Sequence, residues 1–549
     1  MDNAQIADRL EAFAVLLELA ESNPYTIRAY RRAAETIRST PAPVAELVAS
    51  GRVRALRGIG PGIAARLSEL IATGEIAELA ELQRELAPDL VGLGRYLGLS
   101  AARSMQIART LGVHTAQELR DAAAAGRLRS VPGIGPTTEA RLVEALQRSP
   151  EPRARQGLLL NRARDLVDAI AAALGGEPAG DPRRWRDVCE HLAVVCTEPA
   201  SGADRNADAV LDRFTTLPQI VAVIARGHRR ALGVTVEGVP VQLVVAEPHR
   251  VGTELIRATG SPAYVAALEP LPDGPTEREV YARLNVPWCP PELREEPHTD
   301  PPPDLVELSQ IRGDLHCHTT WTDGRASVEE MGRAAQARGY DYLAICDHTP
   351  AVGAVHGLTP DEVRRQGEEI AQANAGLAPF RVLRGIECDI LPDGRLDLPD
   401  DVLAELDWVQ ASVHAGQRTP RRELTKRVTA ALEHPAVSCF SHPTGRLIGR
   451  RPENAVDLDV VFEVALAHGV ALEVNGLPPR LDLSGEHVRE ALRAGVSIVC
   501  STDSHSVRGL ANMELAVRTA RRGGATASDI VNTRGLEAIL NRPGGDVPG

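Results

Sequence analysis

The chain is 549 residues long and has a net charge of −13, with an isoelectric point near 5.7. This length exceeds what one hydrophobic core usually supports, so we expect several domains. The acidic balance excludes a protein coated in basic surface, so any nucleic-acid binding must be local or use backbone amides. Aromatic residues make up only 3% of the sequence, which argues against base stacking as a main source of affinity.

The cysteines and the N-terminal segment indicate a cellular compartment. Eight cysteines are scattered without a C-x-x-C pair, a pattern typical of free thiols in a reducing cytoplasm. The first residues lack the basic and apolar segments of a signal peptide, and no apolar run reaches the roughly 20 residues of a membrane span. We therefore expect a cytoplasmic protein with no membrane partner.

Residues 1–150 are expected to be helical, because Ala, Leu, Glu and Arg dominate and apolar residues recur with a spacing near 3.6. Two segments in this region, 56–64 and 131–138, place a Gly-apolar-Gly turn before a helix. Such a turn lets the backbone approach a phosphate, which the amides at the helix N-terminus then bind. One copy could equally be an ordinary turn between helices, but two copies favour DNA backbone binding. The predicted DNA-binding positions are Gly58, Gly60, Gly62, Gly133, Gly135 and Thr137.

The middle of the chain mixes helical and β patterns. A helix is expected at 158–174 and a strand near 192–196, and residues 231–247 are expected to form a hairpin with its turn at Glu237-Gly238. Residues 287–303 are rich in proline and predict a stiff linker. From residue 311 onward strands alternate with helical stretches, which is the signature of a parallel barrel.

Seven short apolar runs lie in this last region, and six of them end at a residue that can bind a metal. Barrel enzymes place their chemistry at the C-terminal ends of such strands, so these side chains should converge on one mouth. Imidazoles and carboxylates together suit Zn²⁺, Mn²⁺ or Fe²⁺, and a cluster of these metals converts a bridging water to hydroxide at neutral pH. The candidate ligands are His316, His318, Asp323, His348, Glu387, His414, His442, Asp503 and His505.

Two further groups of residues lie beside these candidates. Cys317, Cys346 and Cys388 are adjacent to candidate ligands, but strand alternation turns neighbouring side chains to opposite faces, so we interpret them as packing residues. Arg418, Arg446 and Arg450 follow His414 and His442 on loops and could clamp a phosphate. An ordinary solvated loop position is an equally good interpretation of each arginine.

Several segments together resemble a known family. Residues 23–34, the two glycine turns, residues 260–263 and residues 287–294 resemble family X DNA polymerases. The whole chain resembles the bacterial PolX type, in which a polymerase core precedes a PHP domain. The resemblance implies a multidomain α+β and α/β protein with a helical helix-hairpin-helix region, a nucleotidyltransferase-like palm and thumb, and a distorted (β/α)7 PHP barrel. The implied domains are an N-terminal helical DNA-binding domain (1–82), a fingers-like domain (83–150), a palm (151–230), a thumb-like domain (231–296), a linker (297–310) and the PHP phosphoesterase domain (311–549).

The palm departs from the family pattern at the residues that would hold metal. The family's Gly-Ser-x-x-Arg-Arg-Gly turn here contains Asp181, which would set a negative charge where a triphosphate binds. The Asp-x-Asp positions align with His191 and Ala193, and the third carboxylate aligns with Gln242. Two Mg²⁺ ions have little to hold them without anionic ligands. We therefore expect a degenerate palm that serves as a scaffold.

Two nearby carboxylates, Glu190 and Glu198, keep an active polymerase open as an alternative if the alignment is shifted. Some family members also excise a deoxyribose phosphate through a lysine Schiff base. The single lysine of this chain is Lys426, far outside the opening domain, so that lyase activity is not expected.

In the PHP region the resemblance implies up to three divalent metals. The first would take His316, His318, Glu387 and Asp503. The second would take Glu387, His414 and His442, so that Glu387 bridges the first two metals. The third would take Asp323, His348 and His505.

The expected function is that of a metal-dependent DNA phosphoesterase in DNA repair, acting as a 3′–5′ exonuclease, an abasic-site endonuclease or a 3′-phosphatase. The expected partner is DNA, gapped or with a free 3′ end, which implies a nucleoid-associated location. Three alternatives remain: an active family X polymerase, a non-catalytic DNA-binding repair scaffold, and a small-molecule phosphatase of the histidinol-phosphatase type.

Overall fold

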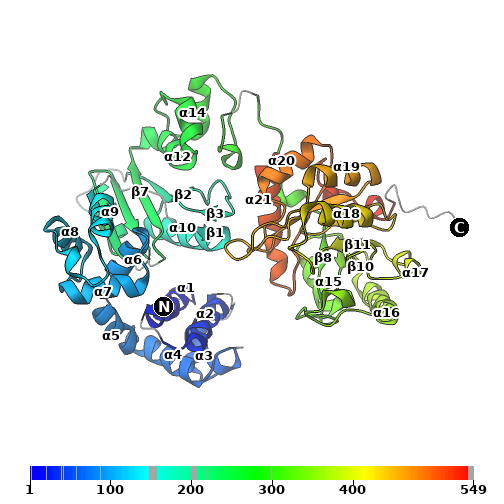
Figure 1. The fold of residues 1–549 in the computed structure, drawn as a ribbon, viewed down its shortest axis with the longest axis horizontal. Coiled ribbons are helices and arrows are strands. Elements are labelled where there is room, and N and C mark those ends of the chain that lie inside the picture. Colours follow the sequence, from blue (N-terminus) through cyan, green and yellow to red (C-terminus); the bar gives the residue numbers. More distant parts are fainter. Residues whose placement is uncertain are drawn as a thin grey trace. The chain divides into compact units, whose positions relative to one another are not determined.

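The computed structural model describes residues 1–541 except positions 2, 20–21, 39, 41–42, 57, 87, 148–156, 199–206, 218, 236 and 298–299 (Figure 1). The chain separates into two compact units. Unit 1 comprises residues 1–157, 166–178 and 190–247, and unit 2 comprises residues 158–165, 179–189 and 248–549. No helix in the described ranges combines the length and the apolar character needed to cross a membrane.

Helices fill the described part of residues 1–147, as the apolar spacing predicts. Ile6, Leu10 and Phe13 fall on one face of the first helix because they are three or four positions apart, and all three are buried. Phe13 meets Tyr30 of the second helix edge to face, with ring centroids 4.9 Å apart. The helices are α1 (Asn3–Leu19), α2 (Pro24–Arg38), α3 (Val44–Ala49), α4 (Pro61–Thr73), α5 (Ala77–Leu86), α6 (Pro88–Tyr96), α7 (Ala101–Leu111), α8 (Ala116–Ala124) and α9 (Pro136–Gln147).

A mixed sheet follows these helices, with the strand order β2-β4-β7-β6-β5. Strands β4 and β7 run parallel, and β6 is antiparallel to both of its neighbours, so the predicted hairpin is present as β6 and β7. Strands β6 and β7 complete the same sheet as β4, so this sheet extends to Ala246 across the boundary expected between residues 230 and 231. The elements are α10 (Leu160–Leu174), β2 (Glu177–Gly180), β4 (Leu192–Thr197), α11 (Ala207–Thr215), β5 (Ala222–Arg226), β6 (Arg230–Val234) and β7 (Pro240–Ala246).

Unit 2 begins with short elements and continues into a barrel. The short elements are β1 (Leu158–Leu159), β3 (Val188–Cys189), α12 (Val251–Thr259), α13 (Pro262–Leu268) and α14 (Glu277–Leu284), and β1 pairs antiparallel with β3. Within residues 300–541, all of which are described, seven strands form one sheet in sequence order. Adjacent strands pair in parallel, and a parallel bridge between Cys317 and Ser504 brings the two ends of the sheet together. The predicted (β/α)7 barrel is therefore present and nearly closed.

The barrel strands match the apolar runs identified in the sequence. They are β8 (Gly313–Cys317), β9 (Tyr342–Ile345), β10 (Arg381–Asp389), β11 (Trp408–Ser412), β12 (Cys439–Phe440), β13 (Ala471–Asn475) and β14 (Ile498–Ser501). Strands buried on both faces read as continuous apolar runs, and this is why the sequence reveals them. The helices between and after them are α15 (Val328–Ala337), α16 (Pro360–Leu377), α17 (Asp400–Leu403), α18 (Arg421–Leu432), α19 (Leu458–His468), α20 (Gly485–Arg493), α21 (Met513–Arg522) and α22 (Leu536–Leu540).

Candidate metal centre

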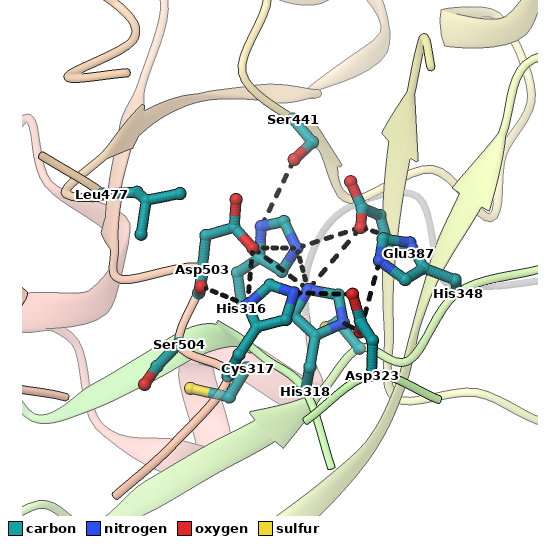
Figure 2. A network of polar contacts seen from close by, with 12 residues as sticks. His316, Cys317, His318, Asp323, His348, Glu387, Ser441, Leu477, Asp503 and Ser504 are labelled. Atoms are coloured by element: carbon teal, nitrogen blue, oxygen red, sulfur yellow. Dashed lines mark hydrogen bonds and ion pairs between the residues drawn. The ribbon is translucent and has the colours of Figure 1, made fainter. Parts of the chain in front are cut away.

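The predicted ligands gather at the C-terminal ends of the barrel strands, where imidazoles and carboxylates face one another (Figure 2). Three groups have ligand atoms that lie within 4.8 Å of one another. These groups are His318, Asp323, His348 and His505; His316, His318 and Asp503; and His348, Glu387 and His414. His442 joins through Glu387, since its Nε2 lies 2.9 Å from Glu387 Oε1. All nine candidate residues therefore belong to one cluster.

The first predicted ligand set is assembled around β8 and the loop after β14. His318 Nε2 lies 3.1 Å from Asp503 Oδ1 and 3.2 Å from His316 Nε2. Glu387 Oε2 approaches the same two imidazoles, at 3.5 Å from His316 Nε2 and 3.6 Å from His318 Nε2. These four side chains can hold one ion together.

Glu387 lies at the centre of the cluster. Its Oε1 is 2.9 Å from His442 Nε2 and 3.3 Å from His414 Nε2, as the second predicted set requires. Its Oε2 also lies 2.9 Å from His348 Nδ1, a residue predicted for the third set. In that third set, Asp323 lies 3.1 Å from His505 Nε2 and 3.6 Å from His348 Nε2. The sets therefore share His348 and His318 as well as Glu387.

The protonation of these groups fits a site built for cations. Burial, together with the nearby His505 and His348, lowers the pKa of His318 to about 4, so this imidazole is neutral and offers a lone pair. Burial opposes the charged form of His348, but Glu387 and Asp323 outweigh it and raise the pKa of His348 to about 10. In the same way Glu387 and Asp389 raise the pKa of His414 to about 9 against the effect of burial.

Buried imidazole nitrogens support the same conclusion. His318 Nδ1 and His442 Nδ1 are buried without a hydrogen-bond partner among the described residues. Unpaired buried polar atoms are costly and rare in folded proteins. Without metal, the positive charge of protonated imidazoles balances the carboxylates of this cluster. Bound divalent metals would supply that positive charge instead, because ligation requires neutral imidazole and ionised carboxylate. The residue set therefore fits metal ions.

Two carboxylates that support the ligands were missed in the sequence. Glu473 of β13 is fully buried and accepts hydrogen bonds from Ser441 Oγ at 3.0 Å and the backbone N–H of His442 at 2.6 Å, while His316 Nδ1 lies 2.6 Å away. Asp389 lies 3.1 Å from His414 Nδ1. Such carboxylates fix the orientation of a ligating imidazole. The available signal was strand alternation, which puts Glu473 on the same face as Asn475.

The three cysteines beside the ligands are buried in apolar clusters, so their predicted packing role is confirmed. Figure 2 shows the sulfur of Cys317 directed away from the imidazoles. Burial raises the pKa of Cys317, Cys346 and Cys388, which keeps these thiols protonated. They are not suited to bind metal in this state.

The three candidate clamp arginines differ in their surroundings. Arg418 and Arg450 are exposed on the loops after β11 and β12. Arg446 has partners within unit 2: it donates to the carbonyl oxygen of Arg480 at 2.8 Å and pairs with Asp187 at 2.7 Å. Its guanidinium is thus held by protein groups. Arg480 was not a candidate from the sequence, and its Nε lies 3.6 Å from Asp503 Oδ2.

The two glycine turns of unit 1 have the expected local form. A short 3-10 turn precedes each of them, and Gly58 and Gly133 adopt positive φ angles of 86° and 78°, which favour glycine. Gly60 is the N-cap of α4, and nothing lies within 4 Å of a Cβ added to Gly60. Gly58, Gly62, Gly133, Gly135 and Thr137 are exposed. Both turns are therefore exposed, although the backbone N–H groups of Ile59 and Ile134 donate within their turns to Leu56 and Val131.

The three palm positions that should carry carboxylates lie together in the sheet. Ala193 of β4 is the register partner of Gln242 in β7, and His191 Nε2 lies 3.3 Å from Gln242 Oε1. Glu190 and Glu198 lie at opposite ends of β4, and Glu198 is paired with Arg229 at 2.6 Å. The location expected for a two-metal site therefore holds an imidazole, a methyl group and a carboxamide.

The preceding turn is held by ion pairs within unit 2. Arg183 makes two hydrogen bonds to Glu277, at 2.7 and 3.0 Å. Asp181 is buried and paired with Arg184, which neutralises the negative charge expected to face a triphosphate.

A known protein resembles this chain over nearly its whole length. The "DNA polymerase/3′-5′ exonuclease PolX" of Bacillus subtilis is 34% identical over 99% of this chain and 100% of its own length. The chain belongs to the PolX family. Family profiles match a helix-hairpin-helix domain at residues 1–76, a SAM-like helix-hairpin-helix tandem at 97–148 and a PHP domain at 314–475.

The barrel region also resembles shorter proteins. A "probable phosphatase" of Acetivibrio thermocellus is 32% identical over 35% of this chain and 78% of its own length. A second, from Thermoanaerobacter sp., is 27% identical over 40% of this chain and 89% of its own length. The PHP match ends at residue 475, and in this PolX-family chain the fold brings Asp503 and His505 into the same cluster.

Proposed function

We propose that this PolX-family chain is a metal-dependent DNA phosphoesterase that acts at 3′ ends in DNA repair, and that its palm no longer polymerises. The observation that carries the proposal is the cluster of nine imidazoles and carboxylates at the barrel mouth. We assign the ligands as the three sets predicted from the sequence, with His318 and His348 close enough to contribute to neighbouring sets. The metal ions would be Zn²⁺, Mn²⁺ or Fe²⁺.

When bound, these metals would supply an activated water and neutralise the phosphoryl and leaving oxygens. The residues of the chain prepare the site for that chemistry. Glu473 and Asp389 orient His316 and His414, and the low pKa of His318 keeps that imidazole neutral. No protein nucleophile is required.

DNA is the proposed substrate because unit 1 has two exposed glycine turns that precede helices. The amides of such turns bind backbone phosphates without reading sequence. This mode suits an acidic protein, and DNA as partner would place the protein with the nucleoid. A gapped duplex or a free 3′ end is the proposed preferred form.

Loss of polymerase activity is supported by the palm. The register pairing of Ala193 with Gln242 and the contact of His191 with Gln242 show that the three aligned positions are neighbours, so a shifted alignment is not needed to bring them together. Glu190 and Glu198 cannot replace the missing carboxylates as a pair. About 8 residues of extended strand place them on the order of 25 Å apart.

The test is a time course on 5′-labelled DNA with added Mn²⁺, using gapped, abasic and 3′-phosphorylated substrates. A ladder of shortened products indicates an exonuclease, a cut at the abasic site indicates an endonuclease, and a mobility change without shortening indicates a 3′-phosphatase. His316→Ala should abolish whichever activity is found. Full activity in that variant would remove the barrel as the site.

This time course and two further assays separate the alternatives. DNA binding without hydrolysis of any substrate would favour a repair scaffold. Primer extension with dNTPs, lost on mutation of Glu190 or Glu198, would show an active polymerase. The similarity to probable phosphatases makes histidinol phosphate a necessary further substrate, and hydrolysis of that compound alone would favour a small-molecule phosphatase.

A further inference from the structure

Arg480 lies beside the candidate metal centre with unused hydrogen-bond donors. Its side chain is 15% exposed, and its Nε and Nη1 are buried without a hydrogen-bond partner among the described residues. The separation of 3.6 Å between Nε and Asp503 Oδ2 is too long for a hydrogen bond. A guanidinium buried with unpaired donors costs free energy, so this position calls for an acceptor.

Asp503 does not accept a hydrogen bond from Arg480 at this distance, and each of its oxygens has a closer partner. Asp503 Oδ1 lies 3.1 Å from His318 Nε2, and Asp503 Oδ2 accepts a hydrogen bond of 3.0 Å from Asn475 Nδ2. If Asp503 also ligates a metal, as proposed, its charge is committed to the ion. Arg480 then faces a metal centre that repels it unless an anion lies between them.

A second guanidinium adds to the positive charge at this place. Arg451 donates to the carbonyl oxygen of Gly445 at 2.9 Å. Burial lowers the pKa of Arg451, and the nearby charge of Arg480 lowers it further, while Asp482 acts in the opposite sense. The charges of Arg480 and Arg451 therefore oppose each other, and the carboxylate of Asp482 offsets part of this effect.

The backbone of Arg480 is held rigidly, as a binding residue requires. The N–H of Arg480 donates to the carbonyl oxygen of Leu477 at 2.8 Å, and Ile448 donates to Pro479 at 2.7 Å. Arg446 donates to the carbonyl oxygen of Arg480 at 2.8 Å and is itself held by Asp187 at 2.7 Å. Arg446 thus supports the loop that carries Arg480.

We propose that Arg480 binds the phosphoryl group of the substrate beside the metal centre, with Arg446 as its positioning residue. A guanidinium presents donors in a planar fork that matches phosphate oxygens, and it stays charged at every working pH. The ligand is a tetrahedral phosphate, either a terminal monoester or an internal diester. This inference rests on the proposed function, since it assigns the substrate-binding group of the same site.

The test measures phosphate binding separately from catalysis. The full chain is loaded with Mn²⁺ and titrated with inorganic phosphate by calorimetry, with metal content determined for every sample. Arg480→Gln should weaken phosphate binding by about 10- to 100-fold while metal content is unchanged. Arg480→Lys keeps the charge but loses the fork, and its affinity should lie between those of the wild type and Arg480→Gln. Arg493→Gln, at an exposed position in the last turn of α20, is the matched control and should bind as the wild type does.

The outcomes distinguish this inference from the proposed function. Unchanged phosphate affinity in Arg480→Gln overturns the inference, and so does loss of metal in that variant, because Arg480 would then only support Asp503. If the wild-type chain binds phosphate through Arg480 but hydrolyses no DNA, the inference stands and the proposed function fails. Oligonucleotides ending in 3′-phosphate and in 3′-hydroxyl serve as competitors. If Arg480→Gln weakens binding of only the oligonucleotide that ends in 3′-phosphate, Arg480 binds a terminal monoester. If it weakens binding of both oligonucleotides equally, Arg480 binds an internal diester.

Arg446→Gln tests the positioning role. It should weaken phosphate binding less than Arg480→Gln does, and it should add little to Arg480→Gln in the double variant, because it acts through Arg480. Full additivity of the two changes would show that Arg446 binds phosphate independently.

Discussion

The barrel mouth and the palm sheet are two places in one chain where parallel strands bring polar residues together. In the barrel the strand ends supply nine imidazoles and carboxylates, with Glu473 and Asp389 supporting them from behind. In the palm the pairing of β4 with β7 still brings three aligned positions together, but they are His191, Ala193 and Gln242. The difference teaches that a sheet keeps its register through backbone pairing and apolar packing, whether or not its polar residues retain a chemical role.

The largest effect on activity is expected at Glu387, which lies at the centre of the barrel cluster. Glu387→Gln keeps the shape of the side chain but removes the charge that faces His316, His348, His414 and His442. Hydrolysis of DNA with Mn²⁺ should fall by at least about 100-fold, since even changes behind a metal ligand cost 10- to 100-fold. His356→Ala, at an exposed histidine, is the control and should leave the rate unchanged. A Glu387→Gln enzyme with wild-type rate would mean that the barrel mouth is not the site of hydrolysis.

The next effect concerns the turn that precedes the palm strands. Glu277 is paired with Arg294 at 2.5 Å and with Arg183 at 2.7 Å, and Arg294 is fully buried. Glu277→Gln should destabilise unit 2 by about 3–5 kcal/mol, because a buried guanidinium loses its partner. All four tryptophans lie in unit 2, so tryptophan fluorescence during urea unfolding reports on this unit. Glu279→Gln, on the exposed side of the same helix, should change stability by less than about 0.5 kcal/mol.

The contribution of this ion pair to the stability of unit 2 should depend on pH. Burial opposes ionisation of Glu277, but Arg294 and Arg183 outweigh it and lower the pKa of Glu277 to about 2. The unfolded value is about 4.3, so the stabilisation is fully present above that pH and is lost as the pH falls toward 2. The stability difference between the wild type and Glu277→Gln should therefore shrink between about pH 4.3 and pH 2. A difference that stays constant across this range would show that the ion pair is not its source.

A smaller effect on activity is expected at Glu473, which orients His316 without joining the three clusters of candidate ligands. Glu473→Gln should reduce Mn²⁺ affinity or the rate of hydrolysis by about 10- to 100-fold. Equilibrium dialysis with Mn²⁺ measures the affinity, and Glu463→Gln on the exposed face of α19 is the control. An unchanged affinity and rate would mean that the supporting layer behind the barrel ligands has no influence on them.

The smallest effect is expected in the palm. His191→Ala and Gln242→Ala remove the contact of 3.3 Å between two residues that are only partly buried. Stability should fall by about 1 kcal/mol, and nuclease activity in the DNA time course should change by less than about twofold. A large loss of hydrolysis in these variants would show that the palm sheet still serves catalysis.

The sequence by itself determined the parts of this protein that depend on neighbours along the chain. The apolar spacing that includes Ile6, Leu10 and Phe13 predicted a helix, and the Gly-apolar-Gly pattern at 56–64 predicted a turn before a helix. The barrel strands were visible because strands buried on both faces are apolar throughout, and the candidate ligands were visible because they end those strands.

Only the tertiary structure decided which polar groups meet. Glu473 lies 157 positions from His316, and the Asp187 carboxylate that holds Arg446 lies 259 positions before it. From its position after His442, Arg446 was a candidate phosphate clamp, yet in the structure it is paired with Asp187. Arg480 instead faces Asp503 with unpaired donors. Local periodicity fixes helices, strands and turns, but partners far apart in sequence are chosen by the pairing of strands and the packing of loops over the barrel mouth.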